Sequence, residues 1–329
     1  MIKLSFEFIS STLQTILRRV GFSDERAEQC ALLFVEASRD GFYSHGLNRF
    51  ARFVQSIDLG VVKVDARPEL VESFGALERW DGGSGPGNLN AYASMARAIQ
   101  LAQTQGLGCV ALRNTNHWMR AGNYGWQAAE AGLIGLCWTN TLPNLPPWGG
   151  TTPKLGNNPL VIAVPRDNGE HVVLDMAMSQ FSYGALENYQ RRNEQLPLIG
   201  GFDSDGELTR DAGKILGSGR PLPIGYWKGS GLSLMLDMVA SLLADGKATF
   251  GITADVVRET QLSQVFMAFA TLAQSREAIL SEILAFMKSS GTEVRYPGEQ
   301  TIKRRKQSLE EGIPVDESVW QEIEALAKR

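Results

Sequence analysis

The sequence predicts a mixed α/β fold in which a central sheet domain carries a helical domain assembled from both chain ends. Residues 5 to about 60 read as three helices, short β-rich runs split by Gly, Asn and Pro begin near residue 80, and an amphipathic helix returns over 316–328. A chain of 329 residues is long enough for two such units. We expect the helical domain at 1–78 together with 301–329, and the sheet domain at 79–300.

Local signals predict the individual elements. Ser23, as an N-cap ahead of the acidic Asp24 and Glu25, begins the second N-terminal helix, and the third runs from near His45 until Gly60 stops it. The further expected strands are 108–113, 133–139, 160–164, 172–176 and 264–270, and the further expected helices are 90–103, 123–131, 232–244, 273–288 and 316–328.

Composition and charge exclude several kinds of partner. The formal net charge of −4 argues against nucleic acid and anionic membranes. No apolar run approaches the ~20 residues that span a bilayer, and no signal-peptide pattern opens the chain. The three cysteines cannot form a disulfide framework, and Cys109 and Cys137 lie in apolar runs that predict buried thiols. We therefore expect a reduced, cytoplasmic protein.

The segment 43–50 carries the first candidate site. His45 and Arg49 are one helical turn apart, which puts a proton carrier and a fixed cation on one helix face. This pair suits a 2-oxo acid, because Arg49 can grip the carboxylate while His45 gives a proton to the neighbouring carbonyl oxygen. A surface histidine beside a solvated arginine is the alternative that this segment alone leaves open.

The segment 225–231 is a candidate anion site. Its glycines and Lys228 precede the helix expected at 232, so bare amides at a helix N-terminus and a lysine could hold a phosphate. Trp227 offers a flat apolar face beside them. A Gly-rich connector with an exposed lysine is the competing interpretation.

Polar residues also follow two predicted strands, where α/β sites usually lie. His117 could hydrogen-bond a substrate or cofactor oxygen, or it could bond a backbone carbonyl. Asp175 could accept from ribose hydroxyls, or it could cap the next turn. His45 and His117 lack a third ligand at local metal-binding spacing, so no metal is expected.

The glycine clusters do not match the dinucleotide-binding fingerprint. The segments 83–88, 217–219 and 229–231 lack its spacing, its strand and helix context, or an acidic residue about 20 positions further on. A Rossmann domain is therefore not predicted.

Taken together, the motifs closely resemble the malate/L-lactate dehydrogenase family of type 2 oxidoreductases over nearly the whole chain. The motifs are Ser44-His45-Gly46 with Arg49, Asn116-His117, Gly156-Asn157-Asn158-Pro159, Asp175-Met176, Lys228-Gly229 and Tyr296-Pro297-Gly298-Glu299. Within the family, the chain looks most similar to members that reduce a diketo sugar acid. That similarity rests on the segments 43–50, 116–120, 124–130, 146–149, 181–184 and 225–231.

This resemblance implies an L-sulfolactate-dehydrogenase-like, non-Rossmann nicotinamide-binding fold, a homodimer, and hydride transfer from NADH or NADPH to a 2-oxo sugar acid. It implies His45 as the proton donor. We expect His45 to act as an imidazolium whose ring is oriented by Ser44. We expect Arg49, Asn48 and His117 to contact the substrate, with Arg49 inferred from its charge and spacing. The residues that the resemblance places against the cofactor are His171, Val172, Val173, Leu174, Asp175, Met176, Ala177, Trp227, Lys228, Gly298, Glu299 and Gln300.

The sequence departs from the family pattern at three places. Asn157 stands where a threonine is usual, no histidine separates Gly298 from Glu299, and the stretch 245–275 looks shortened. The last two departures bear on the adenosine end of the cofactor site.

Other functions remain open at this point. They are reduction of another 2-oxo acid of malate, lactate, ureidoglycolate or cyclic imino acid type, a Schiff-base lyase with Lys228 as nucleophile, and a non-catalytic sugar-acid binder.

Overall fold

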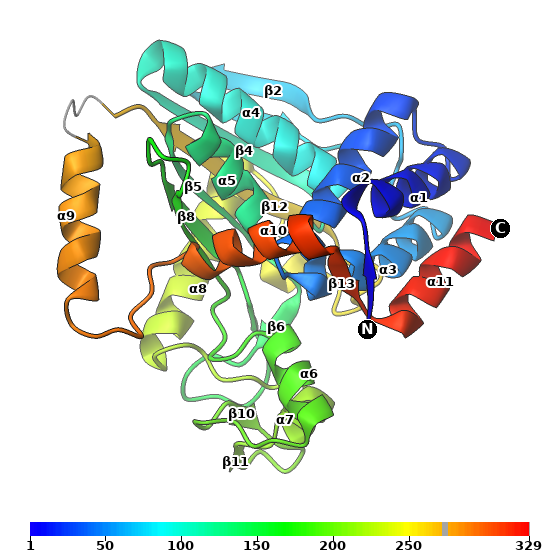
Figure 1. The fold of residues 1–329 in the computed structure, drawn as a ribbon, viewed down its shortest axis with the longest axis vertical. Helices are drawn as coiled ribbons and strands as arrows, with labels where there is room; N and C mark the ends of the chain where they lie inside the picture. The colour runs from blue at the N-terminus through cyan, green and yellow to red at the C-terminus, as the bar shows by residue number, and fades with distance from the viewer. Residues whose placement is uncertain (272–275, 329) are drawn as a thin grey trace.

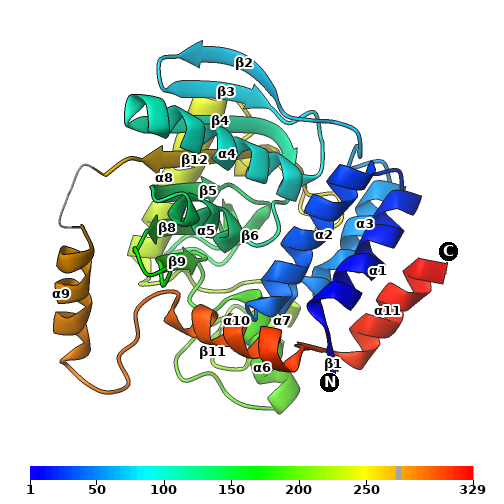
Figure 2. The same ribbon diagram turned by 45° about the horizontal axis from the view of Figure 1, so that its top comes forward.

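The computed structural model describes residues 1–271 and 276–328 and centres on a seven-stranded sheet (Figures 1 and 2). Strands β3 and β4 pair in parallel, and every other neighbouring pair is antiparallel. Strand β12, from the C-terminal half of the chain, lies between β4 and β5. In spatial order the strands are β2 (Glu69–Phe74), β3 (Leu77–Asp81), β4 (Leu107–Asn116), β12 (Thr260–Phe269), β5 (Ile134–Thr139), β8 (Leu160–Val164) and β9 (Val172–Met176).

Helices cover both faces of this sheet. Successive strand residues point to opposite faces, and the buried neighbours Val265 and Phe266 accordingly belong to two different apolar clusters. Phe266 packs with α4 (Gly87–Gln105) and α5 (Gly122–Glu130). Val265 packs with α8 (Trp227–Ala244) on the other face.

The two chain ends form one helical layer beside the sheet. Strand β1 pairs with β13, and the helices share a core that includes Leu13, Phe34, Phe50 and Ile323. The N-terminal and C-terminal helices therefore pack together, while the domain limits at 78/79 and 300/301 remain a prediction. The elements are α1 (Phe6–Arg19), α2 (Asp24–Arg39), α3 (Leu47–Asp58), α11 (Glu317–Lys328), β1 (Ile2–Leu4) and β13 (Ile313–Val315).

The remaining elements lie at the periphery of the sheet. A small lobe with its own apolar cluster projects from one end of the molecule, and α9 stands apart at one side (Figure 1). Helix α10 runs between the sheet and the helical layer (Figure 2). These elements are β6 (Pro143–Leu145), β7 (Leu155–Gly156), α6 (Tyr183–Arg192), β10 (Gly201–Phe202), β11 (Leu208–Thr209), α7 (Ala212–Ser218), α9 (Arg276–Lys288) and α10 (Glu299–Glu311).

The expected central strands are confirmed as β4, β5, β8, β9 and β12, but several boundaries differ from the prediction. The third helix begins at Leu47, after a 3₁₀ turn over Tyr43–His45, because the Ser38 hydroxyl accepts from the Leu47 amide at 2.9 Å. Of the helix expected at 273–288, residues 273–275 lie outside the described residues. The strands β2 and β3 and the helices α6, α7 and α10 were not predicted from the sequence.

No helix within the described ranges combines the length and the apolar character that crossing a membrane requires.

Candidate active site

Two histidines from separate motifs face each other beside the start of α3. The ring centroids of His45 and His117 are 5.8 Å apart, with an angle of 21° between the ring planes. His45 belongs to the 3₁₀ turn before α3, and His117 follows the last residue of β4. Gly46 permits this arrangement, because a Cβ there would lie 2.2 Å from Ser38 Oγ. The tertiary structure thus unites two motifs that are far apart in the sequence.

The hydrogen bonds of the two rings give them different roles. The Met119 amide donates to Nδ1 of His117 at 3.0 Å, so the neutral His117 ring carries its proton on Nε2. His45 Nδ1 is 3.0 Å from the Ser44 hydroxyl, which can donate or accept. His45 can therefore take up a second proton with Ser44 as acceptor, whereas His117 is suited to remain a neutral hydrogen-bond donor.

Electrostatics keep both rings neutral in the free protein. Burial, with the charges of Arg49 and Arg120, lowers the pKa of His45 to about 4. Burial, with Arg49, His45 and Arg52, lowers the pKa of His117 well below its ordinary value. The imidazolium expected for His45 in the reaction is therefore not its resting form in the free protein, and its part in the reaction remains a prediction. A bound anion that offsets the charge of Arg49 would raise this pKa again.

Arg49 faces a buried carboxylate that the sequence analysis missed. Its Nη2 atom is 3.7 Å from Oε2 of Glu259, and Oε1 of Glu259 accepts from the Leu142 amide at 3.2 Å. The described residues provide no hydrogen bond to the Arg49 guanidinium, so its N–H donors are free to bind a ligand. No local pattern links Glu259 to Arg49, because they meet only through the fold.

Arg49, His117 and Glu259 line one cavity, together with Arg52 of α3. Its volume is about 30 Å³, enough for a small polar group rather than a whole sugar acid. Asn48 lies elsewhere: with Ser44 it lines a separate cavity of about 240 Å³ against α6. The structure therefore brings Arg49 and His117 together but turns Asn48 toward the other side of the 3₁₀ turn.

The three segments expected to hold the cofactor converge at β9. The Val173 amide donates to the Pro297 carbonyl at 2.9 Å, and Ile224 donates to Met178 at 2.7 Å. Gly298 adopts φ +95°, and a Cβ on it would lie 3.1 Å from the Val173 nitrogen, so this close approach requires glycine. The chain around 298–300 and the chain before α8 therefore border the two ends of the segment 171–177.

Two side chains of that segment already have partners within the protein. Asp175 accepts from the amide of Gly122, the first residue of α5, at 2.8 Å, so it bonds the start of an earlier helix and not the next turn that the sequence left open. Burial raises the pKa of Asp175, with Arg120 and the Gly122 amide acting against it. Nδ1 of His171 accepts from the Arg166 amide at 3.0 Å. Ribose binding by these two residues remains a prediction.

The predicted cradle of glycine amides near Lys228 is wrong. Helix α8 begins at Trp227, so Lys228 and Gly229 lie in its first turn. Their amides already donate to Gly225 and Ile224, at 3.2 and 2.9 Å. The run of glycines predicted a loop. Gly229 instead lies in the helix, at a position where only glycine fits, because a Cβ there would lie 2.3 Å from the Ile224 carbonyl oxygen. The side chains of Trp227 and Lys228 remain exposed.

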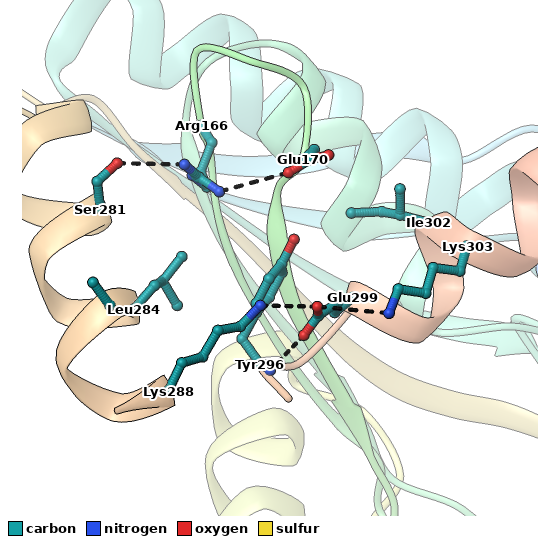
Figure 3. Close-up of a pocket in the computed structure, with 10 residues that line it drawn as sticks. Arg166, Glu170, Ser281, Leu284, Lys288, Tyr296, Glu299, Ile302 and Lys303 are labelled. Atoms are coloured by element: carbon teal, nitrogen blue, oxygen red, sulfur yellow. Dashed lines mark hydrogen bonds and ion pairs between the residues drawn. The ribbon is translucent and has the colours of Figure 1, made fainter. Parts of the chain in front are cut away.

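A cleft of about 260 Å³ lies between α9 and α10, and Tyr296 and Glu299 line it (Figure 3). Each cation that lines it faces a carboxylate. Arg166 bonds Glu277 at 2.5 Å, and Lys288 and Lys303 lie 2.8 and 3.9 Å from Glu299. Glu299 is therefore engaged in ion pairs, and Gln300 accepts from Arg295 at 3.1 Å.

A buried ion network stabilises the surroundings of the two histidines. Asp40 is 1% exposed and accepts from Arg39, Arg120 and Arg305 at 2.6 to 2.9 Å. Burial opposes its ionisation, but these arginines outweigh burial and hold the pKa of Asp40 well below its usual range. Arg120 also stacks on Phe42, 4.2 Å from the ring centroid. The network joins α2, the loop after β4 and α10, and no sequence spacing could have indicated it.

Within the described residues, no group of three or more His, Cys, Asp or Glu side chains is placed to hold a metal ion.

Comparison with known proteins extends over the whole chain. Residues 4–324 match the family model described as malate/L-lactate dehydrogenase. The 2,3-diketo-L-gulonate reductase of Citrobacter koseri is 44% identical, over 98% of this chain and 100% of that protein. Among solved structures, the sulfolactate dehydrogenase of Methanocaldococcus jannaschii superposes with a TM-score of 0.91 at 28% identity, covering 99% of this chain and 97% of the other.

A second solved structure matches over an equally large part of the chain. The delta1-piperideine-2-carboxylate reductase of Pseudomonas syringae gives a TM-score of 0.89 at 28% identity, covering 99% of this chain and 100% of the other. The fold similarity and the full-length family match agree with the motifs around His45, His117 and Gly298. The chain therefore belongs to the malate/L-lactate dehydrogenase family of oxidoreductases.

Proposed function

We propose that this protein is a nicotinamide-dependent reductase of 2-oxo sugar acids, with 2,3-diketo-L-gulonate reduced to 3-dehydro-L-gulonate as the foremost reaction. The observation that carries this proposal is the convergence of His45, His117 and Arg49, which supplies a proton carrier, a neutral donor and a cation at one place. The 44% identical reductase of Citrobacter koseri supports the choice of substrate. Another 2-oxo acid of the family's range is the alternative.

The chemistry follows from the charges of the site. Arg49 binds the substrate carboxylate, whose negative charge offsets the effect of the guanidinium on His45 and so raises the pKa of His45. His45 then takes up a proton, with Ser44 as acceptor at Nδ1, and gives it from Nε2 to the carbonyl oxygen. His117 donates from Nε2 to a substrate oxygen and so orients it. The nicotinamide, when bound, supplies the hydride.

The pH dependence of the reaction tests this account of His45. Because the pKa of His45 is about 4 in the free protein, the protonated fraction falls about tenfold for each pH unit above that value. We expect kcat/KM for reduction to fall with a slope near −1 in a logarithmic plot from pH 5.5 to 7.5, and kcat to fall less. Steady-state rates measured against pH check this, and a flat kcat/KM profile would contradict it.

Family membership implies a nicotinamide cofactor, and we propose that it is NADH held along the segment 171–177. Near one end of this segment, Trp227 offers a flat exposed face and Lys228 an exposed cation. At the other end, Gly298 packs closely against Val173. Within the described chain, every cation that lines the cleft of Figure 3 has a carboxylate partner. This charge balance favours NADH over NADPH, whose additional phosphate needs an unpaired cation.

Replacing Lys228 by alanine tests this placement. We expect the dissociation constant for NADH to rise roughly three- to tenfold at low salt, because an exposed cation next to a phosphate contributes about 1 kcal/mol, and we expect the difference to shrink as salt is added. Calorimetric titration measures both effects. Lys328→Ala removes an equally exposed cation from the far end of α11 and should change nothing. Unchanged NADH affinity of Lys228→Ala at low salt would remove Lys228 from the cofactor site.

The Schiff-base lyase is the less favoured function. Nucleophilic lysines are usually desolvated in apolar pockets, whereas Lys228 is exposed. Borohydride trapping of the substrate on Lys228 would support the lyase.

We further propose a cytoplasmic homodimer. All three cysteines are buried and free, which suits a reducing compartment. Helix α8 exposes a row of large apolar side chains of the kind that subunit interfaces bury. The row consists of Leu234, Met235, Met238 and Leu242, which are 41 to 78% exposed.

A further inference from the structure

We propose that Glu259 sets the charge of the cavity beside Arg49 so that the site accepts a substrate with one acidic group and rejects one with two. This inference rests on the proposed function, because it concerns the choice among 2-oxo acids at the same site.

The contacts of Glu259 support a role toward ligands rather than in packing alone. Its side chain is 5% exposed, so the carboxylate is almost entirely removed from water. Oε1 accepts from the Leu142 amide, while Oε2 faces Arg49 at 3.7 Å, beyond hydrogen-bond distance. The two charges therefore attract each other without binding each other closely, and both line the cavity. A ligand in this cavity meets the carboxylate as well as the guanidinium.

The charges around the cavity add up simply. Arg49 and Arg52 contribute two positive charges, Glu259 one negative charge, and His117 none. Burial raises the pKa of Glu259, but Arg49 and the Leu142 amide stabilise its anion. With Glu259 in its ion pair with Arg49 at 3.7 Å, the formal charge of the lining is +1, which one carboxylate neutralises. The cavity of about 30 Å³ takes one carboxylate, so a second acidic group of the same ligand would lie outside it, uncompensated and repelled by Glu259.

Hydroxyl groups have the opposite relation to Glu259. A hydroxyl can donate to the free lone pairs of Oε2, whereas a carboxylate can only repel them. The site thus favours a monocarboxylate with a polyhydroxylated chain over a dicarboxylate of similar size.

A pair of substrates matched in carbon number tests the inference. Oxaloacetate and 2-oxobutyrate differ by one terminal carboxylate, and kcat/KM for each is measured with the wild type and with Glu259→Gln. We expect the ratio of oxaloacetate to 2-oxobutyrate to rise by at least about tenfold in the variant, because one repulsive charge at close range is removed. Glu28→Gln removes the same charge from the exposed surface of α2 and should leave the ratio unchanged.

Two further variants separate charge from structure. Glu259→Asp keeps the charge and should retain the wild-type ratio, and Arg52→Gln, at an exposed position, should lower the ratio even if Glu259→Gln does not fold. Calorimetric affinities of the two acids give the same ratio without turnover. An unchanged ratio in folded Glu259→Gln overturns the role of Glu259. If that variant does not fold, an unchanged ratio in Arg52→Gln overturns the account by the charge of the cavity. A wild type that reduces no 2-oxo acid with either nicotinamide, yet shows the expected affinity ratios, contradicts only the proposed function.

Discussion

His45→Ala is expected to lower kcat by about 10²–10⁴-fold, the range for loss of a positioned general acid, while NADH still binds. The ring of His45 is the one that can take up a proton, since Ser44 can accept at Nδ1 while the Met119 amide holds His117 as a neutral donor. The cofactor segments converge at β9 and do not include the 3₁₀ turn of His45, so NADH affinity should be unaffected.

Single-turnover rates and NADH fluorescence titrations measure the two quantities separately. The truncation leaves a space the size of an imidazole, so added imidazole should restore part of the rate in His45→Ala. His117→Gln retains a donor and should lose less activity than His45→Ala. Near-normal turnover in His45→Ala would eliminate His45 as the proton donor.

Arg49→Lys is expected to raise KM for a 2-oxo acid about 10- to 100-fold, although the charge is retained. A lysine presents a point charge in place of the planar fork that binds a carboxylate through two hydrogen bonds, each worth about 1.5 kcal/mol or more. The guanidinium is available for this, because its contact with Glu259 at 3.7 Å is an ion pair without a hydrogen bond.

Steady-state kinetics and substrate binding at equilibrium check this expectation. Arg52→Lys, on the next turn of α3 and exposed, should have a much smaller effect. If the wild type binds the amide of the substrate as tightly as the acid, no residue clamps the carboxylate.

Local sequence patterns predicted most of the sheet and part of the site. The β-runs of β4, β5, β8, β9 and β12 are recognisable because alternate or continuous apolar residues must be buried on one or both faces. The spacing of His45 and Arg49 predicted one helix face for both, which is wrong: His45 lies in the 3₁₀ turn before α3, and only Arg49 lies in the helix. Periodicity and spacing are properties of residues close together in the chain, so they can be recognised from the sequence alone.

Other properties depend on residues that meet only in the folded chain. Helix α8 extends back to Trp227, and Gly229 packs against the Ile224 carbonyl. The amides of Lys228 and Gly229 therefore bond within the chain and do not form the predicted phosphate site. The carboxylate of Glu259, from a distant part of the chain, meets Arg49 only in the folded structure. Such pairings carry no periodicity or motif, so sequence reasoning had no signal for them.

The sequence by itself determined the family, because membership depends on motifs such as Ser44-His45-Gly46, and the same motifs are the source of the residues that we propose for the reaction. Only the tertiary structure decided the protonation state of His45, through its burial and the charges of Arg49 and Arg120. It alone also brought Glu259 to Arg49 in the cavity that we propose for the substrate carboxylate. Both depend on distance and burial, and these are quantities that the order of residues along a chain does not contain.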